Sequence, residues 1–310
     1  MSGPGLPTLD QLRVLLAVAE TGSFSAAAKR LRRAQSVVSY TIANLEGQLG
    51  LALFVRGRRR PELTEAGRAV LADARRVTRL MDELRARAAG LTAGLEAEVA
   101  LAVDVMFPTA DLVAALEAFA AAFPTVALRL RVETLGAVVE LVLGGVCGLG
   151  ISSPMGVRAD RLDSRLIRHI ELIPVAAPGH PLAELPAPLP VASLHEHVQL
   201  VLSDRSALTD GQDFGVLSPR TWRLGDLGAK HALLRAGLGW GNMPAHMVCD
   251  DLAAGRLVRL RMATPQGRRL PLLLIHPAAA PPGPAARWLA DRFTADAPPE
   301  PLDIAVTGDA

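Results

Sequence analysis

The stretch SFSAAAKRLRRAQSVVSYTIANLEGQLG, residues 23–50, decides the fold of the N-terminal part of the chain. Within it, Val38, Ile42, Leu45 and Leu49 recur at spacings of four, three and four residues. That spacing places them on one face of a helix that begins at Gln35. The opposite face of this predicted helix is short and polar, and it carries Ser36, Ser39, Tyr40 and Ala43.

Two shorter helices are predicted before this one. Apolar residues recur at helical spacing over residues 9–19, and the pattern stops at Gly22, since glycine favours a helix end. Ser23 is a suitable N-cap for a second helix that runs to Leu31, and residues 32–34 form a turn. Three short helices with a tight turn before the third are typical of a helix-turn-helix, whose last helix enters the major groove of DNA.

Residues 51–63 predict a basic hairpin after the third helix. Two brief strands, LALFV and PEL, flank a run of five residues of which four are arginine. Such a hairpin is a wing, and its arginines can pair with phosphates, which supply affinity and register but no direct sequence information. The N-terminal segment is therefore predicted to be an all-α winged helix-turn-helix.

Charge is divided unevenly along the chain. Residues 1–60 hold 9 Lys and Arg against 3 Asp and Glu, a net charge of +6. Of the totals of 33 and 31, this leaves 24 basic and 28 acidic side chains elsewhere, a net charge of −4. Only the N-terminal segment is suited to a polyanion, although charge alone favours an ordinary solvated basic surface.

Three segments of this region resemble the DNA-binding segment of LysR-type transcriptional regulators. They are GSFSAAAKRL, AQSVVSYTIANLEGQLGLALFVR and PELTEAG, and the resemblance covers roughly residues 8–67 without gaps. The chain departs from the family pattern in the number of wing arginines and at Ala34, where a Ser or Thr often precedes the glutamine. The second departure removes a side chain that would cap the third helix.

The resemblance assigns the third helix and the wing to DNA. Tyr40 is the only tyrosine in the chain, and an exposed aromatic residue at this place favours DNA contact over packing. Gln35 is either a plain helix-start residue or an amide that pairs with adenine or a phosphate, and we favour contact. The predicted DNA-binding residues are Ser23, Arg32, Arg33, Gln35, Ser36, Ser39, Tyr40, Thr41, Arg56, Arg58, Arg59 and Arg60.

A long helix is predicted from Thr64 and Glu65 to Ala89, with its end at Gly90. Its apolar and small residues repeat at heptad spacing, and its other faces are charged. Such a seam packs either within its own chain or against a second copy, and the charged faces favour a homodimer that presents two recognition helices to a roughly palindromic site. The seam comprises Gly67, Val70, Ala74, Val77, Met81, Leu84, Ala88 and Leu91.

Residues 97–152 alternate the strands EVALAVDV, VALRLRV and CGLGIS with the helices ADLVAALEAFAAAF and GAVVELVLGG, which is typical of a parallel βαβαβ unit. A second set follows from about residue 164, with strands near LIPVAA, VQLVLS and LVRL and helices near LGAKHALLRAG and PAHMVCDDLAAG. The strand LPLLLIHP and the helix ARWLADRF return to the first lobe. Two α/β lobes joined by crossovers resemble the periplasmic-binding-protein-like effector domain of LysR-type regulators.

In such sheets, ligands bind beyond the carboxyl ends of the strands. The loops predicted there are residues 104–109, 133–134, 203–205 and 237–244, and the alternative for each is a routine connecting loop. In the first loop a Met-Phe-Pro sequence stands where many relatives carry Ser or Thr, which predicts a more apolar pocket that is less suited to a small carboxylate. The effector-binding candidates are Asp104, Met106, Phe107, Pro108, Thr109, Glu133, Thr134, Ser203, Gly241, Asn242, Met243 and Pro244.

Other classes of function lack their signatures. The chain has no GxSxG, GxxxxGK[ST] or HExxH motif and no GxGxxG at the start of a helix, so no catalytic residue, cofactor or metal ligand is predicted. The HxH of His195 and His197 is more typical of a surface, and Cys147 and Cys249 are interpreted as buried structural thiols. A solute-binding protein shares the two lobes, but a basic N-terminal segment without a signal peptide argues against it.

The sequence therefore predicts a protein of the reducing cytoplasm with no membrane span, because it has no run of about 18 apolar residues and no paired cysteine spacing. Its expected partners are double-stranded operator DNA, a small-molecule effector and a second copy as a homodimer. A homotetramer and contact with RNA polymerase are implied by the resemblance. The expected domains are the winged helix-turn-helix in residues 1–63, the linker helix in 64–91, the effector-binding domain of two lobes in 92–296 and a flexible tail in 297–310.

Overall fold

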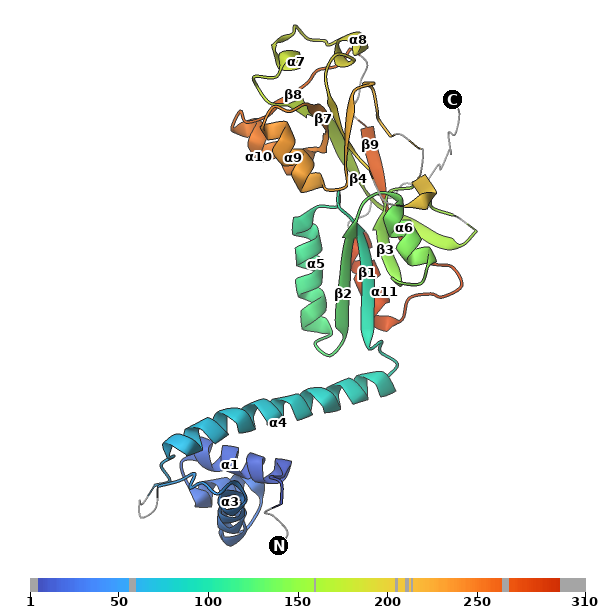
Figure 1. The fold of residues 1–310 in the computed structure, drawn as a ribbon. Helices are drawn as coiled ribbons and strands as arrows, with labels where there is room; N and C mark the ends of the chain where they lie inside the picture. The colour runs from blue at the N-terminus through green and yellow to red at the C-terminus, as the bar shows by residue number, and fades with distance from the viewer. Residues whose placement is uncertain are drawn as a thin grey trace. The chain divides into compact units, whose positions relative to one another are not determined.

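The computed structural model describes residues 5–55, 60–158, 160–203, 206–209, 212, 214–263 and 268–295. The chain divides into two compact units, Met1–Gly90 and Leu91–Ala310 (Figure 1). Within the described part of the chain, no helix is both long and apolar enough to cross a membrane.

Three short helices open the N-terminal unit where the periodicity predicts them. A capping box formed by Thr8 and Gln11 starts the first helix, and the Ser23 hydroxyl caps the second by accepting a hydrogen bond from the Ala26 N–H. The third helix follows Ala34 without a side-chain cap, as the departure from the family pattern predicts. The helices are α1 (Leu9–Thr21), α2 (Phe24–Leu31) and α3 (Gln35–Leu49).

The core of the N-terminal unit lies where these helices meet. Val38, Ile42 and Leu45 of α3 belong to one buried cluster with Leu15 and Val18 of α1. Because one face of α3 is held in this core, its polar face is left at the surface.

Side-chain contacts hold the segment after α3. The described residues there form a single antiparallel bridge between Phe54 and Leu63. The Glu46 carboxylate accepts a hydrogen bond from the Leu53 N–H at 2.6 Å and another from the Phe54 N–H at 3.2 Å. The prediction of two strands is therefore wrong in extent, because the carboxylate of α3 takes N–H groups that a longer ladder would use. Residues 56–59 lie outside the described part of the chain.

Helix α4 (Glu65–Thr92) is longer than predicted, because it continues through Gly90 and the chain turns only at Gly94, whose φ is +82°. Glycine weakens a helix by its backbone freedom but keeps its N–H donor, so it does not end a helix by itself. The Thr64 hydroxyl caps the start of α4 by accepting a hydrogen bond from the Gly67 N–H at 2.9 Å.

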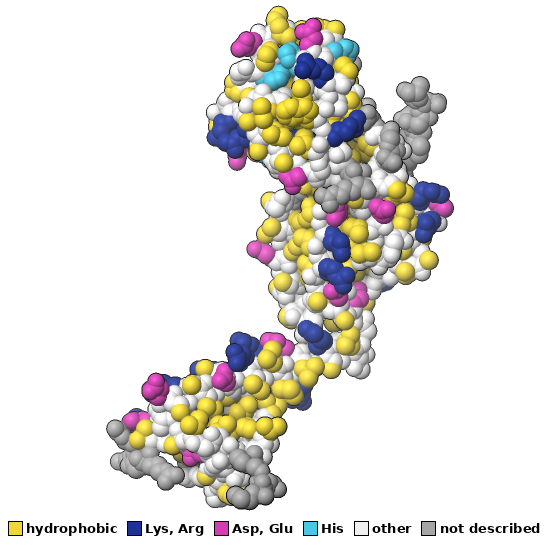
Figure 2. Space-filling model, viewed as in Figure 1, with side chains coloured by type: hydrophobic (Ala, Val, Ile, Leu, Met, Phe, Trp, Pro, Cys, Tyr) yellow, Lys and Arg dark blue, Asp and Glu magenta, His cyan; other side chains and the backbone are white. Residues whose placement is uncertain are grey.

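The two ends of α4 differ in burial. Gly67, Leu71 and Ala74 are buried in the N-terminal core, so the first turns pack within their own unit. Figure 2 shows hydrophobic side chains gathered along α4 beside charged ones. Beyond Ala74, exposed large apolar side chains are Val77 (40% exposed), Leu80 (55%), Leu84 (58%) and Leu91 (49%).

A sheet of nine strands, in the order β2-β1-β3-β9-β4-β7-β5-β6 with β8 beside β4, builds the C-terminal unit. In lobe 1, β1 pairs in parallel with β2 and with β3, which confirms the predicted βαβαβ unit. Helices α5 and α11 cover one face of this lobe and α6 covers the other (Figure 1). Lobe 1 consists of β1 (Glu98–Asp104), α5 (Thr109–Ala122), β2 (Ala127–Glu133), α6 (Gly136–Leu143), β3 (Leu149–Ser152) and α11 (Pro284–Thr294).

Two long antiparallel strands, β4 (Leu162–Ala176) and β9 (Arg268–Pro277), run through both lobes. Strand β9 returns to pair with β3 of lobe 1, as predicted. Strand β4 begins near residue 162, whereas the sequence predicts a strand only near residues 172–177. The difference arises because β9, a distant segment, pairs with β4 along nearly its whole length.

Lobe 2 confirms the predicted second α/β set but contains two strands that the sequence pattern does not predict, β6 and β7. The predicted loop at residues 237–244 is largely strand β7, so that prediction is wrong. A Cβ on Gly241 would lie 2.6 Å from the Leu200 carbonyl oxygen, so this glycine allows close approach of a neighbouring strand rather than a turn. Lobe 2 consists of α7 (Pro181–Glu184), α8 (Val191–Leu194), β5 (Gln199–Leu202), β6 (Thr221–Leu224), α9 (Leu227–Arg235), β7 (Trp240–Pro244), α10 (Ala245–Ala253) and β8 (Val258–Arg259). The short helix η1 (Ala207–Thr209) follows β5 in the chain but packs against α6 of lobe 1, where Leu208 contacts the apolar core.

Candidate DNA-binding face and effector site

The outer face of α3 is polar and exposed. Gln35, Ser36 and Ser39 are exposed, and the Tyr40 ring is 68% exposed although the helix around it is anchored in the core. An aromatic ring with a hydroxyl in this position can stack against or hydrogen-bond a nucleic acid. The structure therefore brings four of the predicted DNA-binding residues onto one surface.

Two further residues of this face, Val37 and Asn44, are missing from the sequence prediction. Val37 is 46% exposed, and Asn44 is also exposed. They lie three residues before and four residues after Tyr40, which places all three side chains on one side of α3. The helical period that identifies the buried face could have found them, because it defines the exposed face at the same time.

The basic residues beside α3 differ in their partners. Arg33 forms a two-pronged ion pair with Asp10 of α1, with both N–O distances 2.7 Å. This hydrogen-bonded pair raises the pKa of Arg33 and lowers the pKa of Asp10. Arg33 therefore holds the turn to α1, whereas Arg32 ends α2 in the left-handed conformation and forms no ion pair among the described residues.

The remaining predicted DNA-binding residues are placed as follows. Ser23 caps α2 with its hydroxyl, and the Thr41 hydroxyl donates to the Val37 carbonyl at 2.8 Å, so both side chains have roles within the fold. Arg60 is exposed. Outside the described residues lie Arg56, Arg58 and Arg59.

The loop after β1 joins the two lobes. The Asp104 carboxylate accepts a hydrogen bond from the Met106 N–H at 2.9 Å. Met106 then belongs to the core of lobe 2, whereas the neighbouring Phe107 belongs to the core of lobe 1. Pro108 and Thr109 follow at the start of α5, and Thr109 is exposed. The two apolar residues of the predicted pocket loop are thus buried in separate cores.

A charged and aromatic stack holds the lobe 1 side of this loop. Phe107 packs edge-on against Phe293, with ring centroids 5.6 Å apart. The Arg168 guanidinium lies 5.3 Å from the Phe107 centroid and also forms an ion pair with Asp111. These contacts connect the crossing strand β4 to α5 and fix the position of the loop.

The carboxyl ends of β2 and β5 meet across the lobes. The Thr134 hydroxyl, after β2, donates to the Ser203 carbonyl, after β5, at 3.3 Å. The carbonyl of Glu133 accepts a hydrogen bond from the Val105 N–H, so this loop also touches the one after β1. Leu135 follows with φ +46°, a strained value for a residue with a side chain, and such strain is most common at functional sites.

Strand β7 divides its predicted site residues between two faces. Met243 is buried in the core beneath α9 and α10, and Gly241 faces the same side, where the nearest side-chain atom to its absent Cβ is Cε of Lys230. Asn242 lies on the other face, and its Oδ1 is buried without a partner among the described residues. Pro244 ends the strand and precedes α10.

Sequence reasoning missed two buried polar residues close to these loops. The Lys230 ammonium donates to the Asn242 carbonyl at 2.7 Å, and burial lowers the pKa of Lys230 to about 8. Ser153 directly follows β3, and its hydroxyl is buried with no partner in the described part of the chain. Nothing in the local pattern marks either one, because a lone lysine or serine usually indicates the surface.

The two cysteines and the histidines considered in the sequence lie outside the predicted effector loops. Cys147 is buried, and burial raises the pKa of its thiol. Cys249 is exposed, so the interpretation of both cysteines as buried is wrong for this one, because it lies on the outer side of α10. The His197 ring packs on the buried His180 ring, with centroids 5.2 Å apart. Histidines gather at the end of lobe 2 that carries α7 and α8 (Figure 2).

A recognition helix with an exposed polar face, joined to a two-lobed α/β domain, defines the class of helix-turn-helix regulators with a ligand-binding domain. Residues 9–68 match the bacterial regulatory helix-turn-helix protein of the lysR family, and residues 92–298 match the LysR substrate binding domain. The chain belongs to the LysR family of transcriptional regulators.

Similar proteins agree with this assignment. The chain is 31% identical to the probable HTH-type transcriptional regulator YhaJ of Escherichia coli K12, over 84% of this chain and 86% of that protein. It is 30% identical to the HTH-type transcriptional regulator PunR of the same strain, over 82% of this chain and 83% of that one. The fold resembles the Corynebacterium glutamicum OxyR C206 mutant with a TM-score of 0.53 at 19% identity, covering 94% and 93% of the two chains. These relatives bear the names of regulators, and the chain is a DNA-binding regulator rather than an enzyme.

Proposed function

We propose that this regulator reads operator DNA with the exposed face of α3 and holds the DNA backbone with the arginines of the wing. The observation that carries this proposal is Tyr40, which is 68% exposed on a helix whose opposite side buries Val38, Ile42 and Leu45 in the core. Gln35, Ser36 and Ser39 lie beside it. Such a regulator acts at the chromosome, so we place it in the cytoplasm, where it would meet RNA polymerase at a promoter.

Gel shifts of chromosomal fragments at several salt concentrations test the DNA assignment. Arg60→Ala should weaken binding to all fragments similarly and reduce the salt slope by about one, since it removes one phosphate contact. Tyr40→Ala should instead change which fragments bind best. Arg287→Ala, an exposed arginine of the other unit, is the matched control. An unchanged salt slope in Arg60→Ala, together with an unchanged order of fragments in Tyr40→Ala, would refute the assignment.

We propose that α4 also dimerises the protein. Val77, Leu80, Leu84 and Leu91 are exposed at spacings of three, four and seven residues, which is a coiled-coil seam left without a partner in the single chain. A dimer would present two recognition helices to one site. Lobe 1 exposes further apolar side chains, which support a second contact and hence a tetramer: Val113 (48% exposed), Leu130 (38%) and Val132 (51%).

We divide the chain into a DNA-binding domain in residues 1–63, a linker in 64–91, an effector-binding domain in 92–296 and a tail in 297–310. Within the effector-binding domain, we place the effector at the carboxyl ends of β1, β2, β3 and β5. Buried polar atoms without partners in the described residues support this site, because a ligand would supply the missing hydrogen bonds of Ser153 and Asn242. The strained Leu135 and the Thr134 hydroxyl lie at the same edge.

A thermal-shift screen of the full chain against metabolites grouped by charge and polarity tests this placement, since a ligand bound only to the folded state raises the melting temperature. Thr134→Val should abolish the shift of a true effector. Thr125→Val makes the same change just before the amino end of β2 and should leave the shift intact. Equal shifts in both variants would place the effector elsewhere.

A further inference from the structure

A hollow on lobe 2 lies apart from the carboxyl ends of the strands. It has a volume of about 440 Å³ and is lined by Ala232, Arg235, Ala236 and Arg256. Volumes of this size hold small-molecule ligands in other proteins. Arg235 is the last residue of α9, whereas α9 begins shortly after the carboxyl end of β6, so the hollow is at the far end of this helix.

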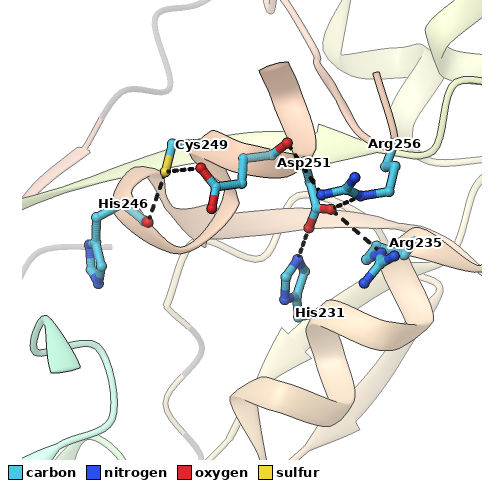
Figure 3. Close-up of polar contacts among 7 residues, drawn as sticks. His231, Arg235, His246, Cys249, Asp251 and Arg256 are labelled. Carbon is cyan, nitrogen blue, oxygen red and sulfur yellow. Dashed lines mark hydrogen bonds and ion pairs between the residues drawn. The ribbon is translucent and has the colours of Figure 1, made fainter. Parts of the chain in front are cut away.

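Asp251 of α10 holds the two arginines of this hollow together. Its carboxylate is buried, with only 6% of the side chain exposed. One carboxylate oxygen, Oδ1, pairs with the Arg256 Nε and lies 3.6 Å from the Arg235 Nε. The other oxygen, Oδ2, lies 2.5 Å from the His231 Nε2. Figure 3 shows Arg235, Arg256 and His231 gathered around the one carboxylate.

This arrangement holds the two guanidinium groups in place before any ligand binds. It also leaves the group with a net positive charge. Asp251 supplies one negative charge against the two permanent charges of Arg235 and Arg256. The arrangement also lowers the pKa of Asp251, chiefly through its hydrogen bond with Arg256, so the carboxylate is charged at neutral pH. Because Asp251 already restricts the two arginine side chains, they lose little conformational entropy when a ligand binds.

The outer atoms of both guanidinium groups remain available. Asp251 takes the Nε atoms, and the Nη2 of Arg256 makes a weak hydrogen bond of 3.3 Å with the Asp250 carbonyl. Arg235 has no other ion pair among the described residues, and the side chains of Arg235 and Arg256 are 49% and 47% exposed. The Asp250 carboxylate lies toward Cys249, whose Sγ is 3.6 Å from its Oδ1. The planar fork of arginine matches the geometry of carboxylates and phosphates.

The floor of the hollow leaves space between the charges. Ala232 lies on α9 and Ala236 directly follows its last residue; because they are four residues apart, both lie on one side of the helix. Their methyl groups cannot fill the volume between the two guanidinium groups, as longer side chains would. The hollow thus combines a small concave space with a residual positive charge.

We infer that Arg235 and Arg256 form a second ligand site, which binds a small oxyanion with the chemistry of a phosphate or a dicarboxylate. The Nη groups of both arginines hold the anion over Ala232 and Ala236. Asp251 is a positioning residue that orients the two guanidinium groups without touching the ligand. This site does not depend on the proposed effector site or on the DNA-binding face.

Isothermal titration calorimetry of the full chain at constant ionic strength tests the inference, with inorganic phosphate and succinate in separate arms. Arg235→Gln should weaken binding about tenfold or more, since it removes a charged hydrogen-bond donor. Ala232→Leu should weaken binding without changing charge, because it fills the hollow. Arg259→Gln is the matched control: it removes an equally exposed arginine of lobe 2, paired with Glu171. It should bind like the wild type.

The arms give distinct outcomes. Saturable binding of either anion that depends on Arg235 and Ala232 supports the site. The anion that binds more tightly shows whether the natural ligand is a phosphate or a dicarboxylate. Equal binding by wild type, Arg235→Gln and Ala232→Leu would overturn the inference, because the anion would then bind elsewhere, such as the N-terminal arginines. Absence of saturable binding would also overturn it. If sedimentation shows that Arg235→Gln changes only the association state, the hollow receives a second copy of the chain, and the inference is wrong.

Discussion

Lys230 offers a direct test of the energetics of lobe 2. It is one of only two lysines in the chain and is 4% exposed, and its ammonium donates to the Asn242 carbonyl at 2.7 Å. Burial lowers its pKa from 10.5 to about 8. We expect Lys230→Met, which keeps the length of the side chain and removes its charge, to stabilise the C-terminal unit at neutral pH.

The magnitude follows from the two pKa values. Below pH 8 the lysine is protonated in both states, and folding must bury its charge. The difference between 10.5 and about 8 corresponds to a cost of about 3 kcal/mol. Between these values the unfolded chain binds more protons than the folded one, so the free energy of unfolding rises with pH by about that amount. Methionine avoids the cost but loses the hydrogen bond of a charged donor, which contributes about 2 kcal/mol. The net gain at pH 7 is therefore about 1 kcal/mol.

Urea unfolding of the full chain from pH 7 to pH 10, followed by tryptophan fluorescence, measures this effect. All three tryptophans, Trp222, Trp240 and Trp288, lie in the C-terminal unit, so the signal reports that unit alone. Lys29→Met, at the exposed second lysine in the N-terminal unit, is the control and should behave like the wild type. If Lys230→Met retains the wild-type rise with pH, or is less stable at pH 7, the reasoning is refuted.

Three other substitutions test separate parts of the fold. Gly67→Ala should lower the unfolding free energy of the N-terminal unit by about 2 kcal/mol, since its Cβ would lie 2.1 Å from the Leu53 carbonyl oxygen. Unfolding followed by circular dichroism measures this change, and Gly47→Ala, which has open space around its Cβ, should not show it. Leu84→Glu should produce folded monomers in sedimentation runs, and intact dimers would contradict the α4 seam. Asp251→Asn should lower the melting temperature at neutral pH. This difference should shrink as pH falls below 3.8 through the lowered pKa of Asp251, where the wild type also loses its charge, and a constant difference would count against the cluster.

The sequence predicted most reliably the elements whose signal is local. The spacing of Val38, Ile42 and Leu45 placed α3 at the residues where it lies, and its opposite face is exposed as predicted. The alternation of strands and helices likewise placed the βαβαβ unit of lobe 1. In both cases the periodic burial of one face is written in neighbouring residues, so no distant contact is needed to read it.

Local patterns misjudged the elements that distant segments complete. Gly239 and Gly241 suggested a loop, yet Gly239 directly precedes β7 and Gly241 lies within it. Only a residue without a side chain fits at these two positions, beside the Val198 and Leu200 carbonyls. Gly90 suggested a helix end, yet α4 continues past it to Thr92. A glycine reports close approach or backbone freedom, and the sequence does not say which one applies.

For this chain, residue order alone determined the helix-turn-helix, the alternating lobes and the exposed polar face of α3, because each depends on periodicity within one element. Only the tertiary structure decided that Met106 and Phe107 enter different cores, that Lys230 is buried, and that Arg235 and Arg256 converge on Asp251. The physical reason is that burial and charge pairing depend on which distant segments meet, and that choice is made when the crossing strands β4 and β9 bring the lobes together.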